Sequence, residues 1–266
     1  MAKINIDNFE INYLYEDGKD NKPLVLFFHG FGDSYQNFNP ILRMQRNFRF
    51  CGLDFPGCGL SSAKNDLLLE DYYKVALKFI NQVLSDEKQI YIVSHSLGAS
   101  SALFVNSLPQ IKASLLLSPF NEFLTFDKDN LTLPNWLIPS NTQECVESYE
   151  NLFASSNERL NKVANFTCMR RNSSFEFHKR KFEKMVVNQI TNEEYLNNTL
   201  AQMYANASNI YILSGDKDNY TTEIEMEQIK RKYFFDTEIL SNVGHAIIFE
   251  SPEAVLNKIN QIIKEN

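Results

Sequence analysis

The stretch Ile-Tyr-Ile-Val-Ser-His-Ser-Leu-Gly-Ala-Ser, residues 90–100, begins as an apolar run and ends in small and hydroxyl-bearing side chains. The apolar run is typical of a strand buried on both faces of a parallel sheet. A strand that turns sharply into a helix needs small residues two positions before and two after the apex, because strand and helix otherwise collide. Ser94 and Gly98 occupy these positions around Ser96. The stretch therefore predicts a strand–turn–helix unit that presents the Ser96 hydroxyl at the carboxyl edge of a sheet, close to the positive end of the helix dipole.

Comparable apolar runs recur along the chain and alternate with helix-like segments. The strand-like runs lie at 23–30, 49–55, 89–94, 112–118 and 209–214, and the clearest helical faces lie at 72–83 and 255–263. Residues 3–15 instead alternate apolar and polar side chains, which is typical of an antiparallel hairpin. Ser251 and Pro252 are expected to start the last helix, as its N-cap and first helical residue. This order predicts an α/β fold with a mostly parallel sheet and helices on both faces.

One long segment, residues 121–207, interrupts the alternation. It contains no convincing buried strand, but it does contain helical stretches at 176–189 and 192–205. Because structureless loops of that length are rare in compact domains, we expect an inserted helical cap, or lid, at 121–207. Residues 1–120 and 208–266 then form the core.

Charge and cysteine content narrow the class of protein. The 266 residues carry a net charge of −7, which argues against nucleic-acid binding because phosphate contacts need an excess of Lys and Arg. No segment approaches the roughly 18 uncharged residues that span a bilayer, and no apolar run of signal-peptide length opens the chain, so we expect no stable membrane insertion and a cytoplasmic location. The cysteines, Cys51, Cys58, Cys145 and Cys168, form no CxxC pair, so we expect neither a metal site nor a disulfide. Nothing in the sequence specifies an oligomeric state.

A serine hydroxyl needs a base before it becomes a good nucleophile, and the chain offers four histidines. His245 follows a strand-like run and precedes the final helix, which places it at the same sheet edge as Ser96, so we expect it to be the base. His95 lies next to Ser96 and points the wrong way along the turn to serve it. His178 lies in the basic run His-Lys-Arg-Lys, which with Arg170–Arg171 is expected to be a solvated helix face, the alternative being recognition of an anionic substrate or a membrane surface.

An acid is needed to hold the base in the correct tautomer. The apolar run at 210–214 ends in two carboxylates, Asp216 and Asp218, one strand before His245. Nucleophile, acid and base then follow one another in the chain order serine, aspartate, histidine.

At this point the sequence resembles the α/β-hydrolase superfamily, and within it the small esterases and lipases that carry a helical cap. The resemblance rests on five motifs in family order: His29-Gly30-Phe31-Gly32, the loop from Asp54 to Ser62, the turn at Ser96, Gly215-Asp216-Lys217-Asp218, and Gly244-His245 with Glu250-Ser251-Pro252-Glu253 beyond. It covers both ends of the chain and leaves out the 121–207 insert. The family usually has glycine where this chain has Ser94, so the turn must accommodate an additional hydroxymethyl group.

The resemblance implies an eight-stranded sheet and assigns a role to each motif. Ser96 looks like the nucleophile, His245 the base and Asp218 the acid, with Asp216 as a rival for the acid. The backbone N–H groups of Phe31 and Leu97 look like the oxyanion hole, Asp54 is assigned no catalytic role, and no cofactor or metal is implied. Gly30, His95 and Trp136 are expected to contact the substrate, although the apolar residues around Trp136 could equally form the core of the insert.

The reaction expected from these residues is hydrolysis of a small carboxylic ester through an acyl-enzyme. Three other reactions use the same triad: aminopeptidase cleavage of the proline-iminopeptidase type, carbon–carbon bond hydrolysis and acyl transfer. The aminopeptidase alternative is kept open by Glu144, Glu147 and Glu150 in the insert. A non-enzyme alternative is a catalytically silent scaffold that binds a ligand under its cap.

Overall fold

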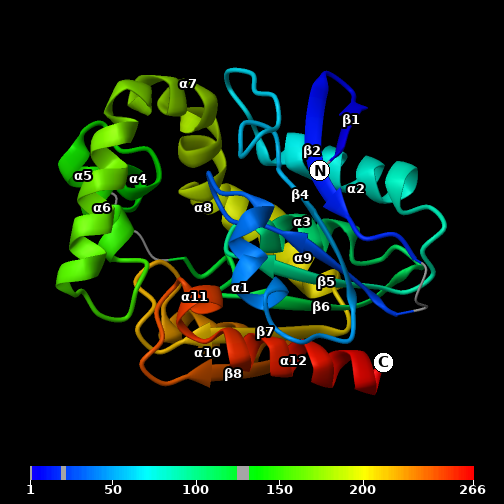
Figure 1. The fold of residues 1–266 in the computed structure, drawn as a ribbon. Coiled ribbons are helices and arrows are strands. Elements are labelled where there is room, and N and C mark those ends of the chain that lie inside the picture. The colour runs from blue at the N-terminus through cyan, green and yellow to red at the C-terminus, as the bar shows by residue number, and fades with distance from the viewer. Residues whose placement is uncertain (1, 19–21, 125–131) are drawn as a thin grey trace.

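The computed structural model describes residues 2–18, 22–124 and 132–266, and its framework is one eight-stranded sheet (Figure 1). The strand order is β1-β2-β4-β3-β5-β6-β7-β8; β1 and β2 are antiparallel to their neighbours, and the strands from β4 to β8 are parallel. The strands are β1 (Ala2–Ile6), β2 (Phe9–Tyr15), β3 (Leu24–Phe28), β4 (Arg49–Leu53), β5 (Ile90–His95), β6 (Ile111–Leu117), β7 (Ile210–Gly215) and β8 (Asp236–Leu240). The predicted α/β class, mostly parallel sheet and amino-terminal hairpin are confirmed.

Helices cover both faces of the sheet because successive strand residues point to opposite sides. In β3, Leu24, Leu26 and Phe28 join one apolar cluster and Val25 and Phe27 the other. The first cluster is covered by α2 (Leu69–Val83), α3 (Gly98–Val105) and α10 (Glu223–Tyr233). The second is covered by the 3₁₀ turn η1 (Tyr35–Phe38), α1 (Asn39–Leu42), α11 (Ile247–Glu250) and α12 (Pro252–Glu265).

The amino end of α12 differs in one detail from its prediction. Pro252 is the first helical residue and Ser251 is the N-cap, as expected, but the Ser251 side chain makes no capping hydrogen bond. The Ser251 backbone has φ −140° and ψ 56°, outside the extended conformation that most N-cap residues adopt. The helix start at this position therefore depends on proline and on packing rather than on a hydroxyl cap.

The chain between β6 and β7 forms the helical insert. Its helices are α4 (Thr132–Leu137), α5 (Thr142–Glu150), α6 (Glu158–Arg171), α7 (Phe175–Met185), α8 (Glu193–Tyr195) and α9 (Ala201–Asn206), with short turns η2 (Asn172–Ser174), η3 (Val186–Ile190) and η4 (Leu196–Leu200) between them. Figure 1 shows α4–α7 gathered in a lobe beyond one end of the sheet. From Phe182 to Tyr204 the insert instead contributes to the same apolar cluster as α2 and α3, so its second half packs on the core. The described part of the insert contains no strand.

A disulfide joins Cys145 on α5 to Cys168 on α6, 23 residues apart in the sequence. The expectation that the cysteines form no disulfide is therefore wrong. The pairing depends on helix packing, because α5 and α6 pack closely together and bring the two side chains face to face. Cys51 and Cys58 are buried free thiols, in agreement with their apolar surroundings.

No helix within the described ranges is long and apolar enough to cross a membrane.

Candidate active site

The serine turn has the strained geometry that its sequence predicts. β5 ends at His95, α3 begins at Gly98, and Ser96 between them adopts a left-handed φ of 51°. Such a conformation is uncommon for a residue with a side chain and is concentrated at functional sites. A Cβ on Gly98 would lie 2.4 Å from the carbonyl oxygen of Phe28, so only glycine fits there. Ser94 is fully buried, and its hydroxyl has no hydrogen-bond partner among the described residues.

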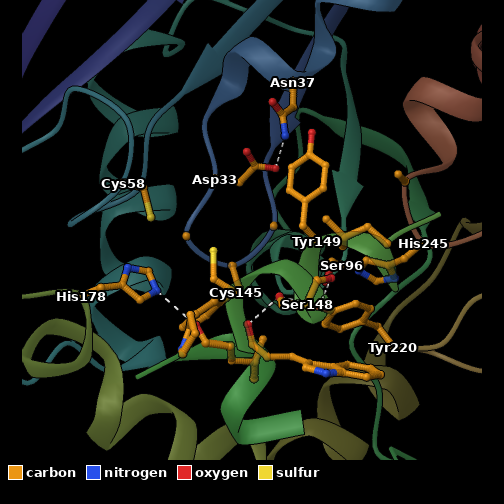
Figure 2. A pocket seen from close by; sticks show the side chains of 18 of the residues that line it. Asp33, Asn37, Cys58, Ser96, Cys145, Ser148, Tyr149, His178, Tyr220 and His245 are labelled. Atoms are coloured by element: carbon orange, nitrogen blue, oxygen red, sulfur yellow. Dashed lines mark hydrogen bonds between the residues drawn. The ribbon is translucent and has the colours of Figure 1, made fainter. Parts of the chain in front are cut away.

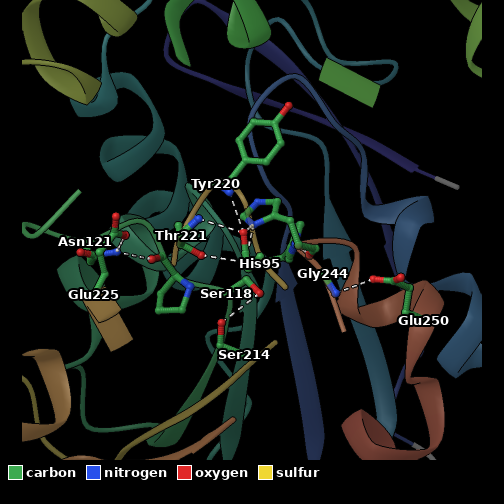
Figure 3. A network of polar contacts seen from close by, with 12 residues as sticks. His95, Ser118, Asn121, Ser214, Tyr220, Thr221, Glu225, Gly244 and Glu250 are labelled. Carbon is green, nitrogen blue, oxygen red and sulfur yellow. Dashed lines mark hydrogen bonds and ion pairs between the residues drawn. The ribbon is translucent and has the colours of Figure 1, made fainter. Parts of the chain in front are cut away.

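His245 and Asp218 form a buried pair at the same sheet edge. His245 Nδ1 lies 2.8 Å from Oδ2 and 3.0 Å from Oδ1 of Asp218, which requires that Nδ1 carry the proton and leaves Nε2 as an acceptor. Asp218 also accepts hydrogen bonds from the Tyr220 and Thr221 amides and from the Thr221 hydroxyl (Figure 3). Burial alone would raise the pKa of Asp218, but His245 and these donors outweigh it and lower the pKa below its usual value. The carboxylate is thus held charged against the imidazole.

The rival carboxylate, Asp216, does not contact His245. Its Oδ1 accepts a hydrogen bond from the Asn242 amide at 2.6 Å, and its other oxygen lies 3.6 Å from the Lys217 ammonium. The structure therefore brings Asp218, and not Asp216, to the imidazole, because β7 ends at Gly215 and three further residues are needed to reach it.

Glu250 braces the loop that carries His245. One carboxylate oxygen accepts a hydrogen bond from the Gly244 amide at 2.7 Å (Figure 3). The other accepts one from the Ala154 amide at 2.9 Å. On the other side of His245, the Ala246 amide donates to the carbonyl oxygen of Leu152 at 2.7 Å. Both neighbours of the imidazole are therefore tied to one segment of the insert. The resemblance includes Glu250 but assigns it no role.

Tyr220 links His245 to helix α5. Its ring stacks on the imidazole with centroids 4.8 Å apart, and its hydroxyl donates to the carbonyl oxygen of Ser148 at 2.9 Å. Trp136 also packs against this tyrosine, with 5.0 Å between the ring centroids. No sequence signal indicated Tyr220, because its contacts come from an insert about 70 residues away along the chain.

His95 also contacts the histidine loop. Its Nε2 donates to the carbonyl oxygen of His245 at 2.8 Å, and burial together with the neighbouring His245 lowers the pKa of His95 to about 3. A Cβ on Gly30 would lie 3.1 Å from His95 Nδ1 and 3.2 Å from the Ser96 Cβ, so glycine allows this loop its close approach. His95 lines the cavity described next, while its ring nitrogen donates to the backbone; its predicted contact with a substrate stays a prediction.

A cavity of about 540 Å³ opens in front of these residues, between the sheet edge and the insert (Figure 2). Ser96, His245 and Tyr220 line one end, and Trp136 from α4 and Tyr149 from α5 also face it. Gly30 and His95, which the sequence analysis expects to contact the substrate together with Trp136, also line the cavity. Phe31, expected in the oxyanion hole, lines it as well, whereas Leu97 is not among its lining residues. Within the described residues, no group of three or more His, Cys, Asp or Glu side chains could hold a metal ion.

The wall opposite the serine carries polar residues that the sequence did not predict there. Arg171, Ser174, His178 and Lys181 line the cavity at helical spacings of three, four and three residues. His178 packs against Phe31, 5.8 Å between centroids, and burial lowers its pKa to about 4. The prediction of a solvated face is therefore wrong for His178 and Lys181. Their spacing along the helix is the signal that would have separated them from the exposed Arg170 and Arg180.

His29 and Asp54, which belong to two of the motifs named above, are occupied by hydrogen bonds within the protein. His29 is fully buried; its Nδ1 donates to the Gly30 carbonyl oxygen at 2.7 Å and its Nε2 accepts from the Phe55 amide at 2.9 Å. Burial lowers its pKa to about 4, so this tautomer is neutral. Asp54 accepts hydrogen bonds from the side chains of Asn12 and Ser34 and from two backbone amides, and it makes no contact with His245.

Comparison with known proteins identifies the family of this chain. The profile of the Alpha/beta hydrolase family matches residues 25–258. The chain belongs to this family. A curated relative from Mycoplasma pneumoniae, named "Putative esterase/lipase 2", is 24% identical and the alignment covers 99% of this chain and 97% of the relative. As an alpha/beta hydrolase with relatives named in this way, the chain is assigned to the hydrolases.

Solved structures share the fold. The structure of a "putative lipase (lip1)" from Acinetobacter baumannii AYE superposes with a TM-score of 0.76 at 18% identity, and the alignment covers 100% of this chain and 92% of that one. The enol-lactonase from Burkholderia xenovorans LB400 superposes with a TM-score of 0.75 at 12% identity and covers 99% of this chain and 100% of its own. At such identities these likenesses establish the architecture alone.

Proposed function

We propose that this alpha/beta hydrolase cleaves a small carboxylic ester through an acyl-enzyme, with Ser96 as nucleophile, His245 as base and Asp218 as the acid that orients it. The observation that carries the proposal is the Asp218–His245 pair, whose remaining imidazole nitrogen is an acceptor at the end of the cavity that Ser96 also lines. A hydroxyl at a strained turn, an imidazole and a buried carboxylate are the three groups that acyl transfer requires.

The oxyanion hole is assigned to the backbone amides of Phe31 and Leu97. Neither amide donates a hydrogen bond to a backbone oxygen in the described turns and loops, so both remain available to a substrate oxygen. Leu97 is the N-cap residue of α3, so the positive end of the helix dipole acts at the same position. Phe31 follows Gly30, and Gly32 after it adopts a left-handed φ of 65°, which sets the direction of this loop.

The reaction follows from these positions. Ser96 Oγ attacks the ester carbonyl carbon while His245 Nε2 accepts the hydroxyl proton, and the carbonyl oxygen becomes an oxyanion held by the two amides. The carbon–oxygen bond then breaks and the imidazolium returns the proton to the departing alcohol. Water repeats the sequence on the acyl-enzyme, releases the acid and restores Ser96. Asp218 stays ionised throughout and stabilises the imidazolium.

The insert, residues 121–207, is proposed to act as the cap over this site. Support comes from the cavity itself, which the insert closes with Trp136, Tyr149 and the wall of α7. We assign Trp136 to the substrate pocket on the same ground. Residues 125–131, which the sequence analysis placed in the insert, lie outside the described residues.

The ester assignment draws support from the name of the curated relative, an esterase/lipase, and from the position of the acidic residues of the insert. Glu144, Glu147 and Glu150 do not line the cavity, and Glu144 is occupied by the Ser140 amide and hydroxyl. The aminopeptidase alternative needs a carboxylate that binds a substrate amine, and these three acids do not provide it. We therefore place ester hydrolysis first.

The cytoplasmic location expected from the sequence can be tested through the disulfide of the insert. A cytoplasmic enzyme would hold Cys145 and Cys168 as thiols, whereas an oxidising compartment would keep the disulfide. Alkylation of the cysteines in intact cells, followed by mass spectrometry, distinguishes the two.

The proposal is tested with 4-nitrophenyl esters from acetate to palmitate, assayed with the wild-type protein and with Ser96→Ala. Turnover that falls by about 10³-fold or more in the variant is the expected result. Comparable turnover in Ser96→Ala would contradict the nucleophile assignment. Absence of turnover in the wild type would favour the silent ligand-binding scaffold.

A further inference from the structure

The cavity wall opposite Ser96 is cationic in a chain that is acidic overall. Among the residues that line the cavity, three have side chains that are ordinarily charged at neutral pH: Asp33, Arg171 and Lys181. The whole chain has 26 Lys and Arg against 33 Asp and Glu, so an excess of cations in this cavity runs against the composition. This excess comes from the insert, the part of the chain expected to select the substrate.

Lys181 is held inside this wall without a carboxylate. Its ammonium donates to the carbonyl oxygen of Gly57 at 2.6 Å and lies over the rings of Phe177 and Phe182, 5.1 and 4.8 Å from their centroids. Among the described residues no Asp or Glu oxygen forms an ion pair with it, in contrast to Lys179 and Lys184 on the same helix. Burial lowers the pKa of Lys181, as expected for a cation removed from water without a counter-ion.

The neighbouring side chains leave this charge uncompensated. Arg171, the last residue of α6, is exposed, and His178 on α7 is neutral because burial lowers its pKa to about 4. Asp33 is the only carboxyl among the lining residues; it accepts a hydrogen bond from Asn37 and interacts electrostatically with Arg171, and burial raises its pKa to about 7. At neutral pH Asp33 is therefore ionised only in part, so it does not cancel both cations.

We propose that Lys181 and Arg171 bind an anionic group of the substrate, so that the ester hydrolysed at Ser96 carries a second, negatively charged carboxylate or phosphate-like group. This inference rests on the proposed ester hydrolysis and names the class of ester. The half-buried ammonium of Lys181 and the exposed guanidinium of Arg171 can each donate charge-assisted hydrogen bonds to such a group. The serine end and the cationic wall are then two subsites of one cavity.

The test compares charged and neutral acyl groups within each protein. The mono-4-nitrophenyl esters of succinic, glutaric and adipic acid are assayed beside the neutral esters in which the second carboxyl is methylated. A further ester, 4-nitrophenyl 4-phosphonobutanoate, distinguishes recognition of a phosphonate from recognition of a carboxylate. In the wild type we expect kcat/KM for the best anionic ester to exceed that of its neutral partner by about tenfold or more, mainly through KM. Lys181→Gln and Arg171→Gln should each reduce that ratio by about tenfold.

Lys179→Gln provides the matched control, because Lys179 lies on the same helix, pairs with Glu183 and does not line the cavity. Its anionic-to-neutral ratio should equal that of the wild type. The anion subsite would be overturned if the neutral esters were turned over as well as every anionic ester, or if the anionic-to-neutral ratio of kcat/KM were unchanged in both cavity variants. Either result would leave the proposed ester hydrolysis unaffected. Absence of turnover on all esters would overturn the proposed function and this inference with it.

Discussion

Substitution of Glu250 by glutamine tests whether the imidazole of His245 is positioned from outside the triad. The carboxylate accepts two backbone hydrogen bonds, from Gly244 at 2.7 Å and Ala154 at 2.9 Å. Glutamine keeps one acceptor oxygen and turns an NH₂ group toward the other amide, so one charge-assisted bond is lost. Hydrogen bonds to charged groups contribute about 1.5–3 kcal/mol. If that stabilisation holds the imidazole in its reactive position, kcat should fall by about 10- to 100-fold.

The assay is kcat on a short-chain 4-nitrophenyl ester, measured beside the thermal unfolding midpoint. Glu253→Gln is the matched control, because Glu253 is exposed in the first turn of α12 and makes no contact with the histidine loop. A merely structural role for Glu250 would lower the midpoint and leave kcat per folded molecule unchanged. A kcat in Glu250→Gln within twofold of the wild type would refute the positioning argument.

Three further predictions follow from the same geometry. Asp218→Asn should lower ester turnover by about 10³-fold or more, whereas Asp216→Asn, which lies outside the imidazole's reach, should stay within a few-fold; the reverse order would move the acid by two residues. Burial and the nearby His245 lower the pKa of His95 to about 3 from its usual 6.5, so the unfolded chain binds a proton first as the pH falls. The free energy of unfolding should therefore decline as the pH falls below about 6.5. Between about pH 7 and about pH 5, urea unfolding of His95→Asn should show a loss of free energy about 2 kcal/mol smaller than that of the wild type; equal losses would contradict this assignment. Reduction of the Cys145–Cys168 disulfide should lower the unfolding free energy by about 3 kcal/mol, seen as a lower unfolding midpoint with reductant than without it; unchanged midpoints would contradict the cross-link.

The parts of the fold that follow a local period were predictable from the sequence. Residues 90–100 gave the strand, the turn and the helix start correctly, because a buried strand and the packing limits at Gly98 are both visible within eleven positions. Parallel strands then bring their carboxyl ends to one edge, which is why the sequence alone predicts Asp218 and His245 near Ser96. The catalytic roles of these residues stay predictions until they are tested.

Contacts set by packing between distant segments could not be predicted in this way. Cys145 and Cys168 pair only because α5 packs on α6, and Tyr220 reaches Ser148 only because the insert folds back over the sheet edge. The basic run that contains His178 and Lys181 was interpreted from its composition, whereas its helical phase decides which members face the cavity. In each case the missing information was the position of the insert relative to the sheet.

The most direct test of the central claim is covalent labelling with a fluorophosphonate, mapped by mass spectrometry and carried out beside the burst of 4-nitrophenol release. The account predicts a single phosphonylated residue, Ser96, together with a burst whose amplitude matches the labelled fraction, and loss of both in His245→Ala. Labelling at another serine, or an undiminished burst in Ser96→Ala, would contradict it.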